Sequence, residues 1–123
     1  AWVSCPASRQ RVHEERARSD AVVVGGSTVR RDDPRLTTRR EGGHQPLRVV
    51  LTRSLDLPPD AKLWDVSAAP TLVVTTVGAR PAFQRRLLEA GVGVAELEEV
   101  TPEAFAQYAA RRGWLQLFWE CDG

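Results

Sequence analysis

The sequence predicts an α/β fold with a central, largely parallel sheet. Short, continuously apolar runs such as residues 21–24 and 71–76 are typical of strands that are covered on both faces. Segments with helical spacing of apolar residues lie between such runs, and one of them follows Thr101-Pro102, a cap followed by a proline at the first helical position. Strands that alternate with helices favour a parallel sheet with helices packed on its faces.

Two helices and one strand are predicted in the first third of the chain. The first helix covers residues 5–18, and a strand follows at residues 20–24. A glycine turn then opens a short helix over residues 25–31. Pro34 prevents this helix from continuing past Asp33, because a proline disfavours the helical conformation in the residue before it.

Four strands and two helices are predicted in the remainder of the chain. Two adjacent prolines indicate a surface turn at residues 57–60. Gly91 and Gly113 are placed to end the two helices. The predicted order is a loop at 39–46, strands at 47–52 and 71–76, a helix at 81–90, a strand at 92–97, a helix at 101–112 and a strand at 114–120.

Composition and size are those of one compact domain of 123 residues. We find no window that resembles a membrane span and no leader-like start, so we expect a cytoplasmic protein with no membrane partner. Cys5 and Cys121 have neither metal-ligand nor redox spacing, and His13 and His44 share no ligand spacing. No metal is therefore predicted.

Charge is unevenly distributed along the chain. The net charge of +1 gives no indication of a nucleic-acid partner. Residues 1–40 hold nine arginines against five acidic residues, whereas the rest of the chain is acidic by three. This excess favours a small phosphorylated ligand, because guanidinium groups bind phosphate in bidentate geometry. Alternatively, arginine is simply the preferred basic residue of this chain, in which Lys62 is the single lysine.

Residues 20–37, DAVVVGGSTVRRDDPRLT, form the most informative segment. A buried strand leads into a glycine turn and a helix start, where backbone N–H groups can bind a phosphate. An ordinary strand–turn–helix junction gives the same local pattern. The segment resembles the reductase domain of bacterial bifunctional riboflavin biosynthesis proteins of the RibD/RibG type. The resemblance continues in order through residues 45–51, 57–61, 70–76 and 117–121, and so covers essentially the whole chain.

This resemblance implies both a fold and an activity. The fold is a dihydrofolate-reductase-like three-layer α/β sandwich, and the activity is that of an NADPH-dependent 5-amino-6-(5-phosphoribosylamino)uracil reductase. Such an enzyme transfers a hydride to the ribose C1′ of a phosphorylated pyrimidine. The residue pattern alone does not separate this fold from a doubly wound Rossmann sheet, although no GxGxxG follows the first strand. No catalytic side chain is assigned.

The family match assigns site residues position by position. It implies substrate contacts for Arg16, Leu36, Arg39 and Glu120, and cofactor contacts for Trp2, Thr28, Asp32, Arg53, Asp122 and Gly123. An arginine at position 53 favours the 2′-phosphate of NADPH, but Arg53 is equally explained as an exposed charge at a strand end. For Glu120, an exposed strand-end acid is the less favoured alternative. Arg16 has the alternative of a solvated helix residue, and Asp32 that of a turn residue. Asp122 stands where the family has a glycine, which places this half of the cofactor site in doubt.

We expect residues 1–123 to be part of a RibD-type reductase domain, incomplete at both ends, from a longer homo-oligomeric parent. The chain contains no methionine, and it ends directly after an apolar strand. Two other functions stay open. One is a different dihydrofolate-reductase-like NADPH reductase that acts on a pterin-type substrate, and the other is a non-catalytic nucleotide-binding fragment.

Overall fold

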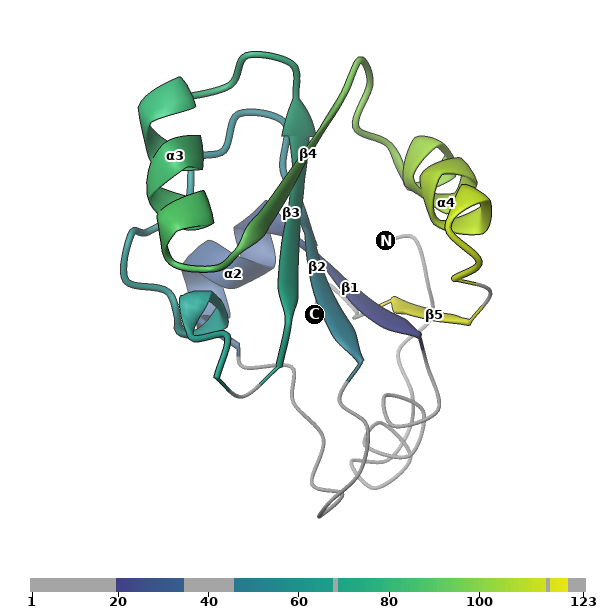
Figure 1. Cartoon of the computed structure of the whole chain (residues 1–123), viewed down its shortest axis with the longest axis horizontal. Helices are drawn as coiled ribbons and strands as arrows, with labels where there is room; N and C mark the ends of the chain where they lie inside the picture. The colour runs from purple at the N-terminus through teal and green to yellow at the C-terminus, as the bar shows by residue number, and fades with distance from the viewer. Residues whose placement is uncertain (1–19, 35–45, 68, 115, 120–123) are drawn as a thin grey trace.

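The structure is a computed structural model, and it describes residues 20–34, 46–67, 69–114 and 116–119 (Figure 1). The described residues form one five-stranded sheet and the helices that pack on it. The strands are β1 (Ala21–Gly25), β2 (Leu47–Leu51), β3 (Thr71–Thr76), β4 (Gly93–Leu97) and β5 (Leu117–Trp119). The helices are α2 (Gly26–Asp32), α3 (Pro81–Glu89) and α4 (Pro102–Arg111), with a 3-10 turn η1 (Lys62–Trp64).

Every pairing in the sheet is parallel, and the strand order is β4-β3-β2-β1-β5. The chain moves outward from β1 to β4, and then returns to the opposite side of β1 to form β5. Ala21 is in register with Leu47 of β2 on one side and with Leu117 of β5 on the other. The prediction of a largely parallel sheet is therefore confirmed.

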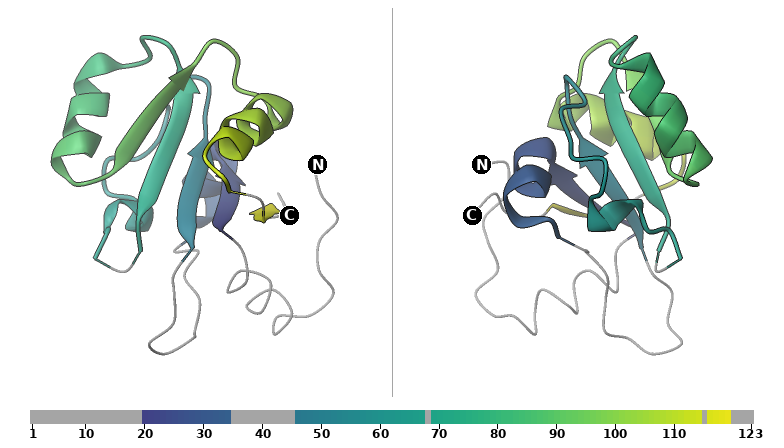
Figure 2. Two further views of the ribbon diagram at one scale, coloured as in Figure 1. Left: turned by 45° about the vertical axis from the view of Figure 1, so that its right-hand side comes forward. Right: turned by 90° about the vertical axis from the view of Figure 1, so that its left-hand side faces the viewer.

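The helices lie in two layers because parallel crossovers are right-handed. α2 and α3 cover one face while the chain moves outward, and α4 covers the other face on the return (Figures 1 and 2). Alternate strand residues point to the two cores, as in β1, where Val22 and Val24 join the α2–α3 core while Ala21 and Val23 join the α4 core. This arrangement confirms the predicted three-layer sandwich.

Most predicted elements are confirmed within one or two residues. Thr101 caps α4 as expected, since its Oγ1 accepts a hydrogen bond of 3.0 Å from the Ala104 amide. The last strand begins later than predicted, at Leu117 rather than at residue 114, because the Trp114 amide donates to the Ala109 carbonyl at the end of α4. The predicted end of this strand, at residue 120, lies outside the described residues. The helix predicted at 5–18 and all but the last residue of the loop predicted at 39–46 lie outside the described residues.

The described residues of the crossover from β2 to β3, 52–67 and 69–70, contain no α-helix. The crossover runs over the α2–α3 face, and its one regular piece is η1, which the sequence did not predict. Its backbone is held by side chains instead. The Trp64 indole N–H donates to the Pro58 carbonyl at 2.8 Å, and the Lys62 amide donates to Oδ1 of Asp33 at 2.8 Å, which ties η1 to the end of α2.

Arg48 is the centre of this arrangement. It lies on β2 and is 1% exposed. Its Nε donates to Oγ1 of Thr71 at 3.1 Å, and its NH2 group lies 2.8–3.1 Å from the carbonyl oxygens of Leu63, Asp65 and Ala69. Burial lowers the pKa of Arg48, and the nearby Asp65 carboxylate opposes that effect. An arginine nonetheless stays charged in a protein, so one buried cation satisfies several carbonyls of the crossover.

We expect Arg48→Met to destabilise the protein strongly. The apolar side chain would leave the carbonyls of the crossover without donors, at a cost of about 2–5 kcal/mol. Urea denaturation of the intact protein measures this loss. The matched control is Arg85→Met on the exposed side of α3, which should change stability by less than about 0.5 kcal/mol. Equal midpoints for the two variants would contradict the role given to Arg48.

Candidate functional site

The strand order reverses beside β1, because β2 lies on one side of β1 and β5 lies on the other. The chain leaves the carboxyl end of β1 toward α2 on one face, whereas α4, which leads into the amino end of β5, covers the other face. Ligands of open α/β sheets bind outside the carboxyl ends of the strands at such a point, where the strand order reverses.

Two glycines line the carboxyl end of β1. A Cβ atom added at Gly25 would meet no described atom within 4 Å, so the backbone there faces open space among the described residues. A Cβ at Gly26 would instead lie 3.1 Å from Oγ1 and 3.2 Å from Cβ of Thr52. The start of α2 thus packs tightly against Thr52 at Gly26, whereas the neighbouring position, Gly25, stays open.

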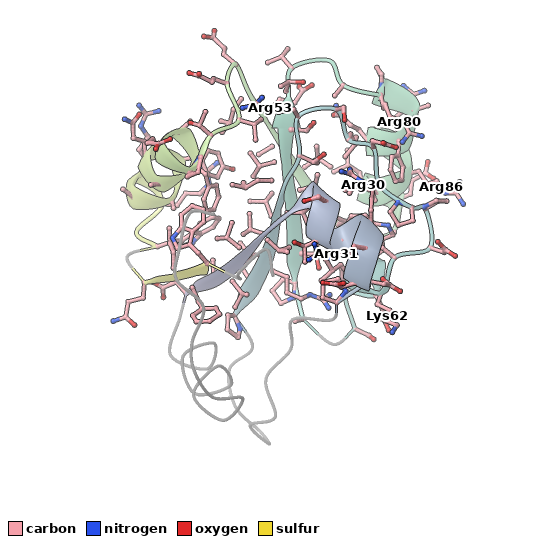
Figure 3. The ribbon with its side chains drawn as sticks, turned by 180° about the vertical axis from the view of Figure 1, so that it is seen from behind. Arg30, Arg31, Arg53, Lys62, Arg80 and Arg86 are labelled. Carbon is pink, nitrogen blue, oxygen red and sulfur yellow. The ribbon has the colours of Figure 1, made fainter. Side chains whose placement is uncertain are left out.

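Arg53 is held at the same edge by hydroxyl groups. Its carbonyl accepts hydrogen bonds from Oγ1 of Thr76 at 2.7 Å and from Oγ1 of Thr75 at 3.2 Å, both at the end of β3. Oγ1 of Thr52 accepts from the amide of Leu55 at 3.2 Å. The backbone on both sides of Arg53 is therefore fixed, while its side chain stays exposed near the strand ends (Figure 3).

The other two described candidates, Thr28 and Asp32, both lie on α2. Thr28 is 7% exposed and sits near the start of the helix. Asp32 sits in its last turn, and its carboxylate oxygens accept hydrogen bonds of 3.1 Å from Nε and NH2 of Arg31. This contact lowers the pKa of Asp32, mainly through the hydrogen bond from Arg31. The structure thus brings the start of α2 close to the Thr52–Arg53 segment, whereas Asp32 occupies the opposite end of the helix.

Seven of the predicted site residues lie outside the described residues: Trp2, Arg16, Leu36, Arg39, Glu120, Asp122 and Gly123. Their proposed roles therefore stay predictions. Sequence reasoning missed the hydroxyls of Thr52, Thr75 and Thr76 as the groups that hold Arg53. The sequence did carry a signal for these contacts, namely threonines at the ends of two adjacent apolar strands.

The turn between β3 and α3 lies at the same edge. Glu96 of β4 reaches back to this turn, and its Oε2 accepts from the amide of Gly78 at 2.6 Å and from Nε2 of Gln84 at 3.3 Å. Nε2 of Gln84 also donates to the Ala79 carbonyl at 2.6 Å. These contacts hold Gly78 in the left-handed region, with φ of 80°, and they lower the pKa of Glu96, chiefly through the Gly78 amide.

Two further properties concern only the described part of the chain. None of its helices is long and apolar enough to cross a bilayer. No group of three or more histidine, cysteine, aspartate or glutamate side chains is arranged there to hold a metal ion.

An open parallel sheet with helices on both faces belongs to a class of α/β proteins that bind ligands at the carboxyl edge of the sheet, where the strand order reverses. Comparison with known proteins gives the family. The family model for the RibD C-terminal domain matches residues 1–123, and the chain belongs to this family. Its fold is accordingly dihydrofolate-reductase-like, as predicted.

Three relatives illustrate the match. The chain is 54% identical over 123 residues to the chloroplastic riboflavin biosynthesis protein PYRR of Arabidopsis thaliana, covering all of this chain and 20% of that protein. It is 44% identical over 122 residues to riboflavin biosynthesis protein RibD of a Synechocystis strain, covering 99% of this chain and 33% of the relative.

A solved structure from Thermotoga maritima is similar with a TM-score of 0.73 and 27% identity, over 98% of this chain and 32% of that chain. That protein is described as a diaminohydroxyphosphoribosylaminopyrimidine deaminase/5-amino-6-(5-phosphoribosylamino)uracil reductase. The chain therefore spans between a fifth and a third of the length of these three relatives.

We expect the contact between Glu96 and the β3–α3 turn to be lost in acid. Because the pKa of Glu96 is lowered from its ordinary value of 4.5, its stabilising effect is full above that pH. It is then lost as the pH falls through the lower pKa of the folded protein. Wild type should unfold at a higher temperature than Glu96→Gln at pH 7, and the difference should shrink below pH 4.5. Glu99→Gln, at an exposed position nearby, is the control; a constant gap between wild type and Glu96→Gln at all pH values would contradict the prediction.

Proposed function

We propose that the protein carrying this chain is an NADPH-dependent 5-amino-6-(5-phosphoribosylamino)uracil reductase of riboflavin biosynthesis. Membership of the RibD C-terminal domain family supports this proposal. So does the name of the Thermotoga maritima protein, whose described activities include this reduction. The observation that carries the proposal is the open carboxyl edge at Gly25, flanked by the fixed Thr52–Arg53 segment.

Gly25 and Arg53 lie at the carboxyl ends of the neighbouring strands β1 and β2, which are about 4.8 Å apart, so one extended ligand can contact both positions. We place the nicotinamide end beside Gly25, where a side chain would otherwise fill the open space. The adenosine end then extends along the edge toward Arg53, whose guanidinium is suited to bind the 2′-phosphate. NADPH supplies the hydride for the ribose C1′ when it is bound.

The chain's own residues then bind and orient the two reactants. We assign the substrate phosphate and base to Arg16, Arg39, Leu36 and Glu120, and further cofactor contacts to Trp2, Thr28, Asp32, Asp122 and Gly123. Thr28 presents a largely buried hydroxyl near the start of α2, close to the open position. Such positioning, rather than a covalent nucleophile, is the contribution that this set of side chains can make to the reaction. The homo-oligomeric state and the cytoplasmic location stay predictions.

Oxidation of NADPH by the intact protein, measured with 5-amino-6-(5-phosphoribosylamino)uracil as substrate, tests the function. We expect substrate-dependent loss of absorbance at the nicotinamide wavelength and formation of the ribityl product. Turnover of a pterin but not of the phosphorylated pyrimidine would favour the related reductase instead. Cofactor binding without turnover of either substrate would identify a binding module.

Arg53 should set the preference for NADPH over NADH. A charge-assisted contact to the 2′-phosphate is worth about 1.5–3 kcal/mol, so Arg53→Ser should reduce the ratio of the two kcat/KM values by about 10- to 100-fold. Efficiency with NADH should change little. Arg85→Ser on α3 is the matched charge control and should leave the ratio intact. An unchanged ratio in Arg53→Ser would show that another group recognises the phosphate.

Thr76 should contribute to the same preference through its hydrogen bond to the Arg53 carbonyl. Thr76→Val removes this bond, which is worth about 0.5–1.5 kcal/mol, and should reduce the NADPH/NADH ratio by about 2- to 10-fold. Thr76→Ser keeps the hydroxyl and should restore the ratio. If Thr76→Val lowers thermal stability but leaves the ratio unchanged, the hydroxyl has only a structural role.

A further inference from the structure

A hollow of about 240 Å³ lies on the α2–α3 side of the molecule, between the crossover and the first turns of α3. It is lined by Pro59, Arg80, Ala82, Phe83 and Arg86. Figure 3 shows Arg80 and Arg86 on the outer surface of α3, on the same side of the molecule as Arg30 and Lys62. None of these residues belongs to the site proposed above, so the hollow requires an explanation of its own.

Arg80 is fixed in place without using up its hydrogen-bonding capacity. Its NH1 group donates to the Leu55 carbonyl at 3.0 Å, and its guanidinium carbon lies 4.6 Å from the centre of the Phe83 ring. The ring and the carbonyl hold the charged group at the wall of the hollow. The remaining N–H groups of this guanidinium have no partner among the described residues. A preorganised cation of this kind loses little side-chain entropy when it binds an anion.

Positive charge at the hollow is not neutralised by the described residues. Neither Arg80 nor Arg86 has a carboxylate within 4.0 Å among them. The nearest acidic residues in sequence are Asp56 and Asp60 on the crossover and Glu89 on α3, all exposed. The first turn of α3 contains no acidic residue and no side-chain cap. The hollow therefore combines two cations with an apolar wall formed by Pro59, Ala82 and Phe83.

We propose that this hollow binds the phosphate group of a small organic phosphate. Arg80 and Arg86 contact the phosphate oxygens, and the apolar wall packs against the carbon skeleton of the ligand. Two arginines suit this group because each can donate two parallel hydrogen bonds to it. The phosphate comes either from a nucleotide or from a sugar phosphate, which share this chemistry. The site is separate from Arg53 and does not depend on the proposed reductase activity.

Calorimetric titration of the intact protein at about 0.15 M salt tests the proposal, with ribose 5-phosphate and 2′,5′-ADP as probes. Arg86→Gln should weaken binding by about 10-fold or more, and Arg80→Gln should do the same. The matched control is Arg85→Gln, which removes an equal charge one residue away and should bind like wild type. Because 2′,5′-ADP also carries the 2′-phosphate that is proposed to bind at Arg53, its titrations are made in the Arg53→Ser background, so that the hollow is measured apart from the carboxyl-edge site.

Each outcome decides the proposal. Loss of affinity for both probes in the Arg80 and Arg86 variants supports a general phosphate site, and loss for 2′,5′-ADP alone identifies a nucleotide as the source. Thermal unfolding verifies that both variants are folded, and Arg86→Gln is sufficient if Arg80→Gln is not, since Arg86 makes no hydrogen bond to the crossover among the described residues. An equal loss in Arg85→Gln, unchanged affinity in the variants, or binding of an acidic peptide in place of the phosphates would overturn it.

Discussion

The buried guanidinium of Arg48 donates hydrogen bonds to backbone carbonyls of the crossover from β2 to β3, where a helix would satisfy such groups itself. In parallel α/β sheets the connection between neighbouring strands is usually a helix, which satisfies its own backbone groups. The crossover from β2 to β3 has only the short turn η1, so its carbonyls need other donors. Arg48 supplies them from beneath, and Arg30 and Arg80 supply them from the two flanking helices, through the carbonyls of Asp56 and Leu55. The three guanidinium groups connect β2, α2 and α3 through one irregular segment.

The same segment links the core to the candidate site. Arg53 lies at the start of the crossover, and its carbonyl accepts hydrogen bonds from the hydroxyls of Thr75 and Thr76 on β3. On the other side of β1, β5 is held by an aromatic cluster under α4. Phe105 contacts Trp119 edge-to-face and stacks on Tyr108, and the Arg112 guanidinium carbon lies 3.7 Å from the centre of the Tyr108 ring. The contacts on the two sides of β1 thus differ in their chemistry, one polar and one aromatic.

The features that the sequence predicted correctly are those whose signals lie close to them in the chain. Apolar runs identified β1 and β3, and the cap at Thr101 identified the start of α4, because these signals lie within a few residues of the element they predict. Arg48 gave no local indication of burial, since its partners Leu63, Asp65 and Ala69 lie on a segment far along the chain. The hold on Arg53 and the strand order also depend on distant pairings. Of the family-derived site residues, the structure describes Thr28, Asp32 and Arg53 alone, and it places Thr28 and Arg53 toward the carboxyl edge of the sheet.

The position of β5 has a consequence for the order in which the strands of the sheet can pair during folding. β1 through β4 are added to the sheet in chain order, each beside its predecessor, so those contacts can form as the chain elongates. β5 instead pairs with β1, with the Asp20 amide bonded to the Gln116 carbonyl and the Gln116 amide to Oδ2 of Asp20. Such distant contacts carry a large loop-closure entropy and form slowly. Among the strand pairings that the structure describes, the pairing of β5 with β1 therefore closes the longest loop, and a ligand at the carboxyl end of β1 lies beside this long-range contact.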